Sequence, residues 1–304
     1  MIIAPKITPN ILDSNINKIE DGIEVWNSDD TFATNAIVQV EDSTRLYKAI
    51  KDVEQGVNPI DDVNEFTGYG EFWYDIGATN YYRAFDEKGS SKTTNENEIY
   101  YKFQISLVDT LMLENIEASE VQIRITNNEN NEIIQDLTLE TTFRDVSDWW
   151  EWTYAEDEYV RTTGAILNMV FDATLEIWIR NTGVVSVAHI VYGRSRDVGL
   201  SLADPAPTVS TRGVTSKTRD EWGNIVTRKK ARYKRMSITC LINAVSIDQI
   251  QNRLEKFVDI PLIIVGDERQ DGFKSLAIFG EIKDHDMPIG TTTTKYQLEV
   301  EGYI

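Results

Sequence analysis

Cysteine and histidine are nearly absent from this chain of 304 residues. Cys240 is the only cysteine, so one chain can form neither an internal disulfide nor a thiolate metal cluster. Of the two histidines, His189 alternates with valines on an expected strand and is interpreted as a satisfied core histidine, while His285 lies in an expected polar turn. The sequence also lacks a phosphate-binding glycine loop and a nucleophile elbow. We therefore expect no cofactor, no bound metal and no enzymatic activity.

Long hydrophobic runs are missing as well. No apolar stretch approaches the roughly 20 residues that a membrane-spanning helix needs, so no membrane insertion is expected. The first residues, 1–6, carry no basic segment followed by a long apolar one, which argues against a secretory signal and for a protein made in the cytoplasm. Hydrophobic residues still make up 41% of the chain, enough to build the cores of two or three domains.

Positive charge is scarce in the first half of the chain and concentrated in one part of the second. Residues 1–160 contain 33 of the 50 acidic side chains and only 11 of the 30 basic ones. Nine Lys or Arg residues, by contrast, lie within 212–235. Because the chain as a whole carries a net charge of −20, it would repel phosphates, and no nucleic-acid binding is expected. The charge asymmetry favours head-to-tail contacts between copies or with a neighbouring protein.

Short alternating runs of apolar and polar residues predict that the fold is mainly β. Such runs occur at 36–40, 99–105, 121–125 and 175–180, separated by polar turns, which is typical of β-sandwiches and small β-domains. One segment, 247–258, has helical spacing instead and predicts a single amphipathic helix in the C-terminal module. Its start has the form of a capping box made by Ser246 and Gln249.

Two polar stretches divide the chain into three expected modules. Residues 86–98 are rich in turn-forming residues, and residues 201–218 contain two prolines among many Ser and Thr. The expected modules are a small β-domain at 1–85, a β-sandwich at 86–195, and a β-rich C-terminal module at 196–304 that contains the basic hairpin 212–235 and the helix 247–258.

The first module resembles small carbohydrate-binding modules of the chitin- and cellulose-binding type. The features shared, in chain order, are Trp26, Phe32, a strand at 36–40, Tyr47 followed by Lys48 and Ala49, Pro59, and Phe72-Trp73-Tyr74. The Gly and Asp usual before the first strand are replaced by Thr34 and Asn35. The resemblance implies that Trp26, Tyr47 and Trp73 stack against sugar rings of a host surface polysaccharide. In the alternative, the same three aromatics form the core of the small domain.

The next segment resembles one that recurs in structural proteins of bacteriophage tails. Residues 72–86 follow the pattern aromatic-Trp-x-Asp-x-Gly-x-Thr-Asn-x-aromatic-x-x-Phe-Asp, and further matches occur at 191–200, 220–228 and 298–304. The sequence of residues 110–165 does not match that of the family, apart from the spacing of the expected strands. The resemblance implies that this segment closes a carbohydrate-module-like domain and opens a galactose-binding-like sandwich. It also implies a protein of the virion tail, located at the tail tip, the collar or the site of fibre attachment.

The middle module carries an aromatic run at 148–154, Asp-Trp-Trp-Glu-Trp-Thr-Tyr. Strand alternation places Trp150, Trp152 and Tyr154 inward with Trp149 at the edge, and we favour the core for Trp150 and Trp152. In the alternative, the run meets a ligand or a partner protein. Cys240 alternates with apolar residues and is expected to be a buried, unreactive thiol.

The basic segment 212–235 predicts two strands around the turn Trp222-Gly223-Asn224. We expect it either to reach another subunit or tail protein, or to fold back on its own sheet with its charges in solvent. The residues expected at a partner interface are Trp222, Arg228, Lys229, Lys230 and Arg232.

Three functions of different classes follow from these patterns. The first is a structural adaptor of a phage tail that forms a symmetric oligomer from copies of itself and docks other tail proteins. The second is a receptor-binding protein that recognises host glycans through its N-terminal aromatics. The third, a polysaccharide depolymerase, has the least support, because acidic residues are too numerous here for any pair to stand out.

Overall fold

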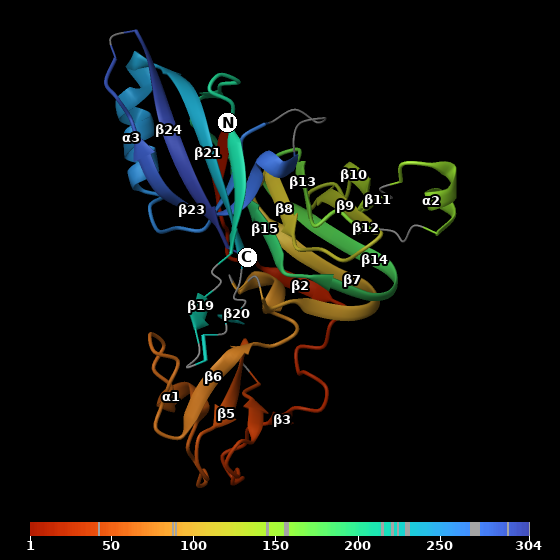
Figure 1. Cartoon of the computed structure of the whole chain (residues 1–304). Coiled ribbons are helices and arrows are strands. Elements are labelled where there is room, and N and C mark those ends of the chain that lie inside the picture. The colour runs from red at the N-terminus through yellow and green to blue at the C-terminus, as the bar shows by residue number, and fades with distance from the viewer. Residues whose placement is uncertain are drawn as a thin grey trace.

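The structure is a computed structural model. It describes residues 1–41, 43–86, 88, 90–143, 146–154, 158–213, 216–219, 222–223, 225–228, 232–267, 274–290 and 292–303, with only the backbone described at 216, 217, 226–228, 232 and 274. Strands dominate it and form several sheets, which confirms the predicted mainly β, sandwich-like fold (Figure 1).

A small sheet lies at the bottom of Figure 1, coloured orange. Its strands, in order across the sheet, are β3 (Glu24–Val25), β4 (Ile37–Gln39), β5 (Arg45–Ala49) and β6 (Trp73–Ala78). A one-turn helix, α1 (Pro59–Asp62), begins at Asn58, whose side chain accepts a hydrogen bond from the Ile60 amide. Trp73 and Phe32 meet edge to face at 5.5 Å in the core of this unit.

Two sheets form the sandwich in the middle of the molecule. The larger has the order β10 (Ile133–Glu140), β9 (Glu120–Asn127), β14 (Ala173–Val187), β7 (Thr93–Ile105) and β2 (Ile11–Ser14); the smaller has β13 (Thr162–Ile166), β8 (Thr110–Glu114) and β15 (His189–Gly193). Alternate residues of both sheets, such as Ile123, Ile177, Leu113 and Tyr192, fill the core between them. The period of two read from the sequence therefore identifies the inward faces correctly.

The C-terminal sheet is long and antiparallel, and one helix packs against it. Its order is β16 (Arg196–Asp197), β1 (Ile2–Pro5), β22 (Leu262–Val265), β23 (Ala277–Asp286), β24 (Thr293–Gly302), β21 (Arg232–Asn243) and β17 (Leu200–Ser201), with β18 (Thr208–Gly213) also on β21. Helix α3 (Ile247–Glu255) buries Ile247, Ile250 and Leu254 against it. His285 lies within β23, so the expected polar turn there is wrong.

The first two strands pair outside the small sheet. β1 is antiparallel to β22 of the C-terminal sheet, where Ile3 and Ala4 are buried, and β2 pairs with β7 of the sandwich. The small sheet itself uses only strands between residues 24 and 78. The expected module 1–85 thus contains two strands that belong to other sheets, because short strands find distant partners that no local pattern reports.

The predicted helix is confirmed and starts at residue 247 as expected, although it ends three residues early and its cap differs from the prediction. α3 ends at Glu255, and turns follow it. The Ser246 side chain makes no capping hydrogen bond, so the predicted capping box is wrong. A 3-10 turn at Ala244–Ser246 precedes the helix, and its cap is Asn243, whose side chain accepts from the Val245 amide. No helix in the described part of the chain is long and apolar enough to cross a membrane.

Two strands of the smaller sheet, β8 and β15, are buried on both faces. Met112 and Val191 point away from the sandwich core and pack against Ala4, Ile263 and Phe279 of the C-terminal sheet. β1 also passes very close to β15: a Cβ on Gly193 would lie 2.4 Å from the Pro5 carbonyl oxygen, so only glycine fits there without a shift. The two larger units are therefore joined by a closely packed, largely apolar interface.

Replacement of Leu254 by Ala tests the burial of α3. Because the side chain is fully buried, we expect the unfolding free energy to fall by about 2–5 kcal/mol. Val245→Ala, at an exposed position just before the helix, should change it by less than about 0.5 kcal/mol. Urea unfolding measures both. A loss below about 0.5 kcal/mol for Leu254→Ala would contradict the packing described here.

Candidate functional site

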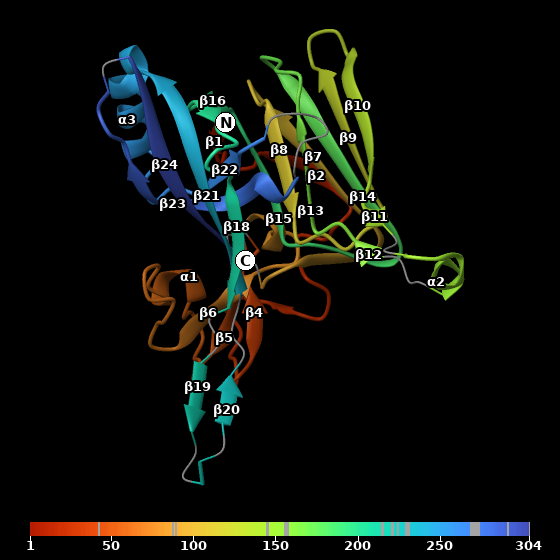
Figure 2. The ribbon, with the colours of Figure 1, turned by 45° about the horizontal axis from the view of Figure 1, so that its top comes forward.

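The basic segment 212–235, called the arm below, forms a hairpin that leaves the C-terminal sheet. β18 pairs with the first half of β21, from Thr208 opposite Ser237 to Gly213 opposite Arg232. Farther along, β19 (Ser216–Arg219) pairs with β20 (Ile225–Arg228) as a separate two-stranded ribbon. Figure 2 shows this ribbon projecting away from the sheet. The predicted two strands are confirmed, and Gly223 has the positive φ of 83° that the turn needs.

Exposed side chains line most of the described arm, although Tyr233, Lys234 and Arg235 at its base are half-buried. All six residues of β18 are exposed, and so are Arg219 and Ile225. Trp222, at the tip, is 84% exposed. Of the other residues expected at a partner interface, Lys229 and Lys230 lie outside the described residues, and Arg228 and Arg232 are described by their backbone in β20 and β21.

The aromatic run at 148–154 forms a second protruding element, the short helix α2 (Trp149–Tyr154). It lies between the paired strands β11 (Thr142–Phe143) and β12 (Glu158–Tyr159) at one end of the sandwich, far right in Figure 1. Trp150 is 69% exposed and Trp152 50% exposed, so the predicted inward alternation is wrong.

A local signal explains this helix. The Asp148 side chain accepts a hydrogen bond from the Glu151 amide, and Glu151 Oε2 accepts from both the amide and the hydroxyl of Ser147. This arrangement is close to a capping box, which favours a helix start over strand alternation. The spacing Asp148-x-x-Glu151 in the sequence indicates this helix start. The interpretation of the run as a strand overlooked that signal.

The aromatic side chains of α2 pack against one another. The Trp149 and Trp152 rings stack at 5.6 Å between centroids and 11° between planes, and Trp150 meets Tyr154 edge to face at 5.3 Å. Val146, Ser147, Asp148 and the stacked pair line a shallow hollow of about 330 Å³. Residues 146–154 are called the tryptophan knob below.

The three aromatics expected to bind sugar belong to the core of the small unit. Trp73 is 0% exposed and donates its indole N–H to the Val57 carbonyl at 3.1 Å, and Tyr47 is buried. Trp26 is partly buried against the same core. The rings of Tyr47 and Trp73 therefore have no open face on which a sugar could stack.

Other aromatics of the small unit do face solvent. Phe66 is 97% exposed, and Tyr69 is exposed while stacking on Tyr74 at 5.7 Å with 17° between the ring planes. Sequence order alone did not single out these residues, because a surface aromatic and a core aromatic look the same in a short polar segment.

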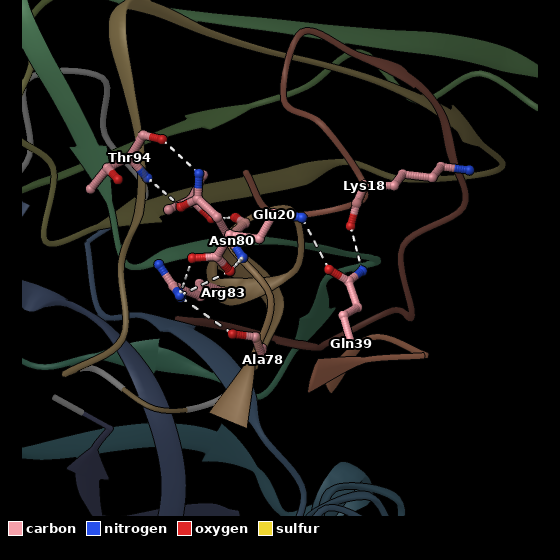
Figure 3. Close-up of polar contacts among 8 residues, drawn as sticks. Lys18, Glu20, Gln39, Ala78, Asn80, Arg83 and Thr94 are labelled. Atoms are coloured by element: carbon pink, nitrogen blue, oxygen red, sulfur yellow. Dashed lines mark hydrogen bonds and ion pairs between the residues drawn. The ribbon is translucent and has the colours of Figure 1, made fainter. Parts of the chain in front are cut away.

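The segment 72–86 connects the small sheet to the sandwich. It supplies β6 to the first, and Tyr81 and Ala84 to the core of the second. Figure 3 shows the polar contacts at this junction. The Arg83 guanidinium donates to both carboxylate oxygens of Glu20, at 2.8 and 3.1 Å, and the Asn80 amide donates to Glu20 at 3.0 Å.

Two further contacts complete the junction. The Asn80 side chain exchanges two hydrogen bonds with the Thr94 backbone at the start of β7, at 2.8 and 3.0 Å. Gln39 of β4 bonds the backbone of Lys18 and of Glu20. Hydrogen bonds from charged and amide groups therefore connect the small sheet, the linker and the sandwich at the segment 72–86 (Figure 3).

A buried polar pair lies in the interface between the sandwich and the C-terminal sheet. Glu114 of β8 and His189 of β15 are directly opposite each other in the strand register, and they are 8% and 1% exposed. Neither Glu114 Oε2 nor His189 Nε2 has a hydrogen-bond partner in the described part of the chain. His189 is thus buried in the core as predicted. The expectation that its ring nitrogens are all hydrogen-bonded is wrong, because Nε2 has no partner among the described residues.

Burial shifts both of these groups towards their neutral forms. It raises the pKa of Glu114 to about 7, against the opposing charge of Lys234, and it lowers the pKa of His189 to about 4, assisted by the charge of Lys6. Lys234 itself donates to the Ala277 carbonyl at 3.1 Å. His189 also packs on the Phe279 ring, with centroids 5.2 Å apart.

Groups suited to catalysis or metal binding are sparse. In the described ranges, no three His, Cys, Asp or Glu side chains are placed to hold a metal ion. Cys240 is buried, and burial raises the pKa of its thiol to about 11. In comparisons with known proteins, no family model, curated protein or solved structure matches the chain. Inferences about function therefore rest on the chain's own surfaces.

The pH dependence of stability tests the buried pair. Glu114, with its raised pKa, contributes stability that is fully present below about pH 4.5 and is lost as the pH rises through about 7. His189, with its lowered pKa, contributes stability that is present above about pH 6.5 and is lost as the pH falls through about 4. The two losses oppose each other, so the pair adds little net pH dependence to the wild-type chain.

Single substitutions should separate the two contributions. Relative to wild type, we expect Glu114→Gln to gain roughly 3 kcal/mol in unfolding free energy between pH 4.5 and 7, and His189→Asn to gain as the pH falls from 6.5 to 4. Glu129→Gln, at an exposed position, is the control and should run parallel to wild type. Denaturant unfolding across this range measures the differences, and a parallel Glu114→Gln curve would refute the assignment.

Proposed function

We propose that this chain is a non-enzymatic structural component of a bacteriophage tail that assembles with copies of itself into a symmetric oligomer and docks other tail proteins. It is made in the host cytoplasm and resides in the virion. The tail setting is supported by the sequence resemblance of residues 72–86 and of the C-terminal segments. The adaptor role is supported by the mainly β architecture and by the arm.

The arm is the observation that carries the proposal. In the described residues, β19 pairs with β20 alone, and a two-stranded ribbon by itself is marginally stable in water. Its outer edges present backbone N–H and C=O groups that a partner strand or loop can satisfy. Trp222 and Ile225 add exposed apolar area near the tip, and tryptophan is enriched among the residues that dominate association energy.

Charge supports the same role. The arm contains nine basic and two acidic residues, whereas residues 1–160 contain 33 acidic and 11 basic ones. A copy that presents its acidic half to the arm of another gains from charge complementarity, which accelerates encounter and favours one docking orientation. Two of the nine basic residues, at the base of the arm, already have partners in their own sheet: Arg235 pairs with Glu299, and Lys234 donates to the Ala277 carbonyl. The complementarity between copies therefore concerns the charges farther along the arm.

Recognition of host glycans by the small unit is a second candidate function. The exposed stack of Tyr69 on Tyr74, together with Phe66, favours it, because flat aromatic faces match the apolar face of a sugar ring. Tyr69→Ala should abolish binding of the chain to host envelope polysaccharide in a pull-down, while Tyr47→Phe, a core change, should leave it intact. Equal binding by the wild type and Tyr69→Ala would exclude this site.

Sedimentation equilibrium of the full chain tests the adaptor proposal. We expect a salt-sensitive oligomer, with a dissociation constant that rises at 0.5 M NaCl because ions screen exposed charges. Trp222→Ala should raise the constant about 30-fold, the effect of a 2 kcal/mol anchor. Arg212→Glu with Arg219→Glu, at exposed arm positions, should also weaken assembly.

The matched control reverses the same number of charges elsewhere. Arg161→Glu with Lys295→Glu changes two exposed basic residues of the sandwich and of β24, and it should leave assembly unchanged. A chain that stays monomeric at all concentrations, or an oligomer indifferent to the arm variants, would overturn the proposal.

A further inference from the structure

The tryptophan knob combines an exposed aromatic surface with a strongly acidic surround. Asp148 and Glu151 are exposed beside the stacked Trp149 and Trp152, and Glu158 is exposed on strand β12, which follows α2 in the chain. In the sequence, residues 144–158 contain six acidic side chains and one basic one. Exposed aromatic clusters of this kind mark interaction sites, and the carboxylates exclude an acidic occupant.

A cationic, aromatic-bearing segment is the partner that fits this surface. Arginine and lysine stack over tryptophan faces within about 6 Å by cation–π attraction, and carboxylates at the rim add charge-assisted hydrogen bonds. A neutral sugar would use the ring faces but would gain nothing from the negative charge around them. The hollow beside Trp149 is shallow and open, so it suits a protruding side chain more than an enclosed ligand.

The same chain carries such a segment at another corner of the molecule. The arm has a net excess of seven positive charges in 24 residues and an exposed Trp222. The arm ribbon and the knob lie far apart in both ribbon views (Figures 1 and 2). One copy therefore cannot join its own arm to its own knob in this conformation, whereas two copies can.

We propose that the tryptophan knob of one copy is the docking site for the basic arm of the next. This inference rests on the proposed self-assembly and names the surface that receives the arm. The contact is heterologous, since two different patches meet, so repetition generates either a closed ring or an open filament according to the rotation per step.

Two variants of the full chain test the pairing. The knob variant, Trp149→Ala with Trp152→Ala, removes the stacked rings, and the arm variant, Arg212→Glu with Arg219→Glu, reverses the charge of the arm. All four positions are exposed, so both variants should keep the wild-type thermal unfolding temperature. Each alone should raise the dissociation constant of self-association at least tenfold in sedimentation equilibrium.

Mixing the two variants gives the decisive result. The intact arm of the knob variant meets the intact knob of the arm variant, and the chain of contacts stops there, so the mixture should form a 1:1 heterodimer and nothing larger. Phe66→Ala with Tyr69→Ala removes two exposed aromatics of the small unit as a control and should assemble as wild type.

The remaining outcomes separate this inference from the proposed function. If the arm variant dissociates but the knob variant assembles normally, the arm docks elsewhere and the inference is wrong while self-assembly stands. If the wild-type chain does not associate at all, the proposed function fails first. If the knob variant assembles normally but loses binding to host polysaccharide, the knob is a sugar site and the inference is overturned.

Discussion

The structure depends on the burial of two neighbouring strands, β8 and β15, on both faces. β8 and β15 face the sandwich core with Leu113 and Tyr192, and the C-terminal sheet with Met112 and Val191. A strand buried on both sides leaves no solvent face for polar residues, so Glu114 and His189 are held in a mostly apolar interface, where Glu114 Oε2 and His189 Nε2 have no hydrogen-bond partner among the described residues. The same packing fixes the C-terminal sheet, and hence the base of the arm, relative to the sandwich that carries the knob.

The buried pair shows how an interface tolerates ionisable groups. Both groups shift towards their neutral forms, because desolvation disfavours a charge of either sign. At physiological pH the imidazole is neutral and the carboxyl is close to its midpoint. The interface is therefore dominated by its apolar contacts, among them Ala4, Ile263 and Phe279. The close approach of β1 at Gly193 adds a steric requirement that no residue with a Cβ meets without a shift of the backbone.

On the outer surface, the features suited to binding, exposed tryptophans and clustered charges, lie on protruding elements. The knob and the arm each combine tryptophan with clustered charge of one sign, and the signs are opposite. Apolar anchors supply most of the affinity in protein interfaces, while charges at the rim set orientation and encounter rate. The polar junction at Glu20, Asn80 and Arg83 belongs to the scaffold, since it ties the small sheet to the sandwich.

Local pattern alone was enough for the elements whose causes are local. Alternation identified the sandwich strands and the buried Cys240, helical spacing placed α3, and the turn around Gly223 identified the arm. Tertiary structure decided the rest. It placed Tyr47 and Trp73 in a core and the tryptophans of α2 in solvent, gave β1 and β2 their partners, and brought Glu114 opposite His189. Periodicity reports which residues share a face, but what covers that face depends on segments far away in the chain.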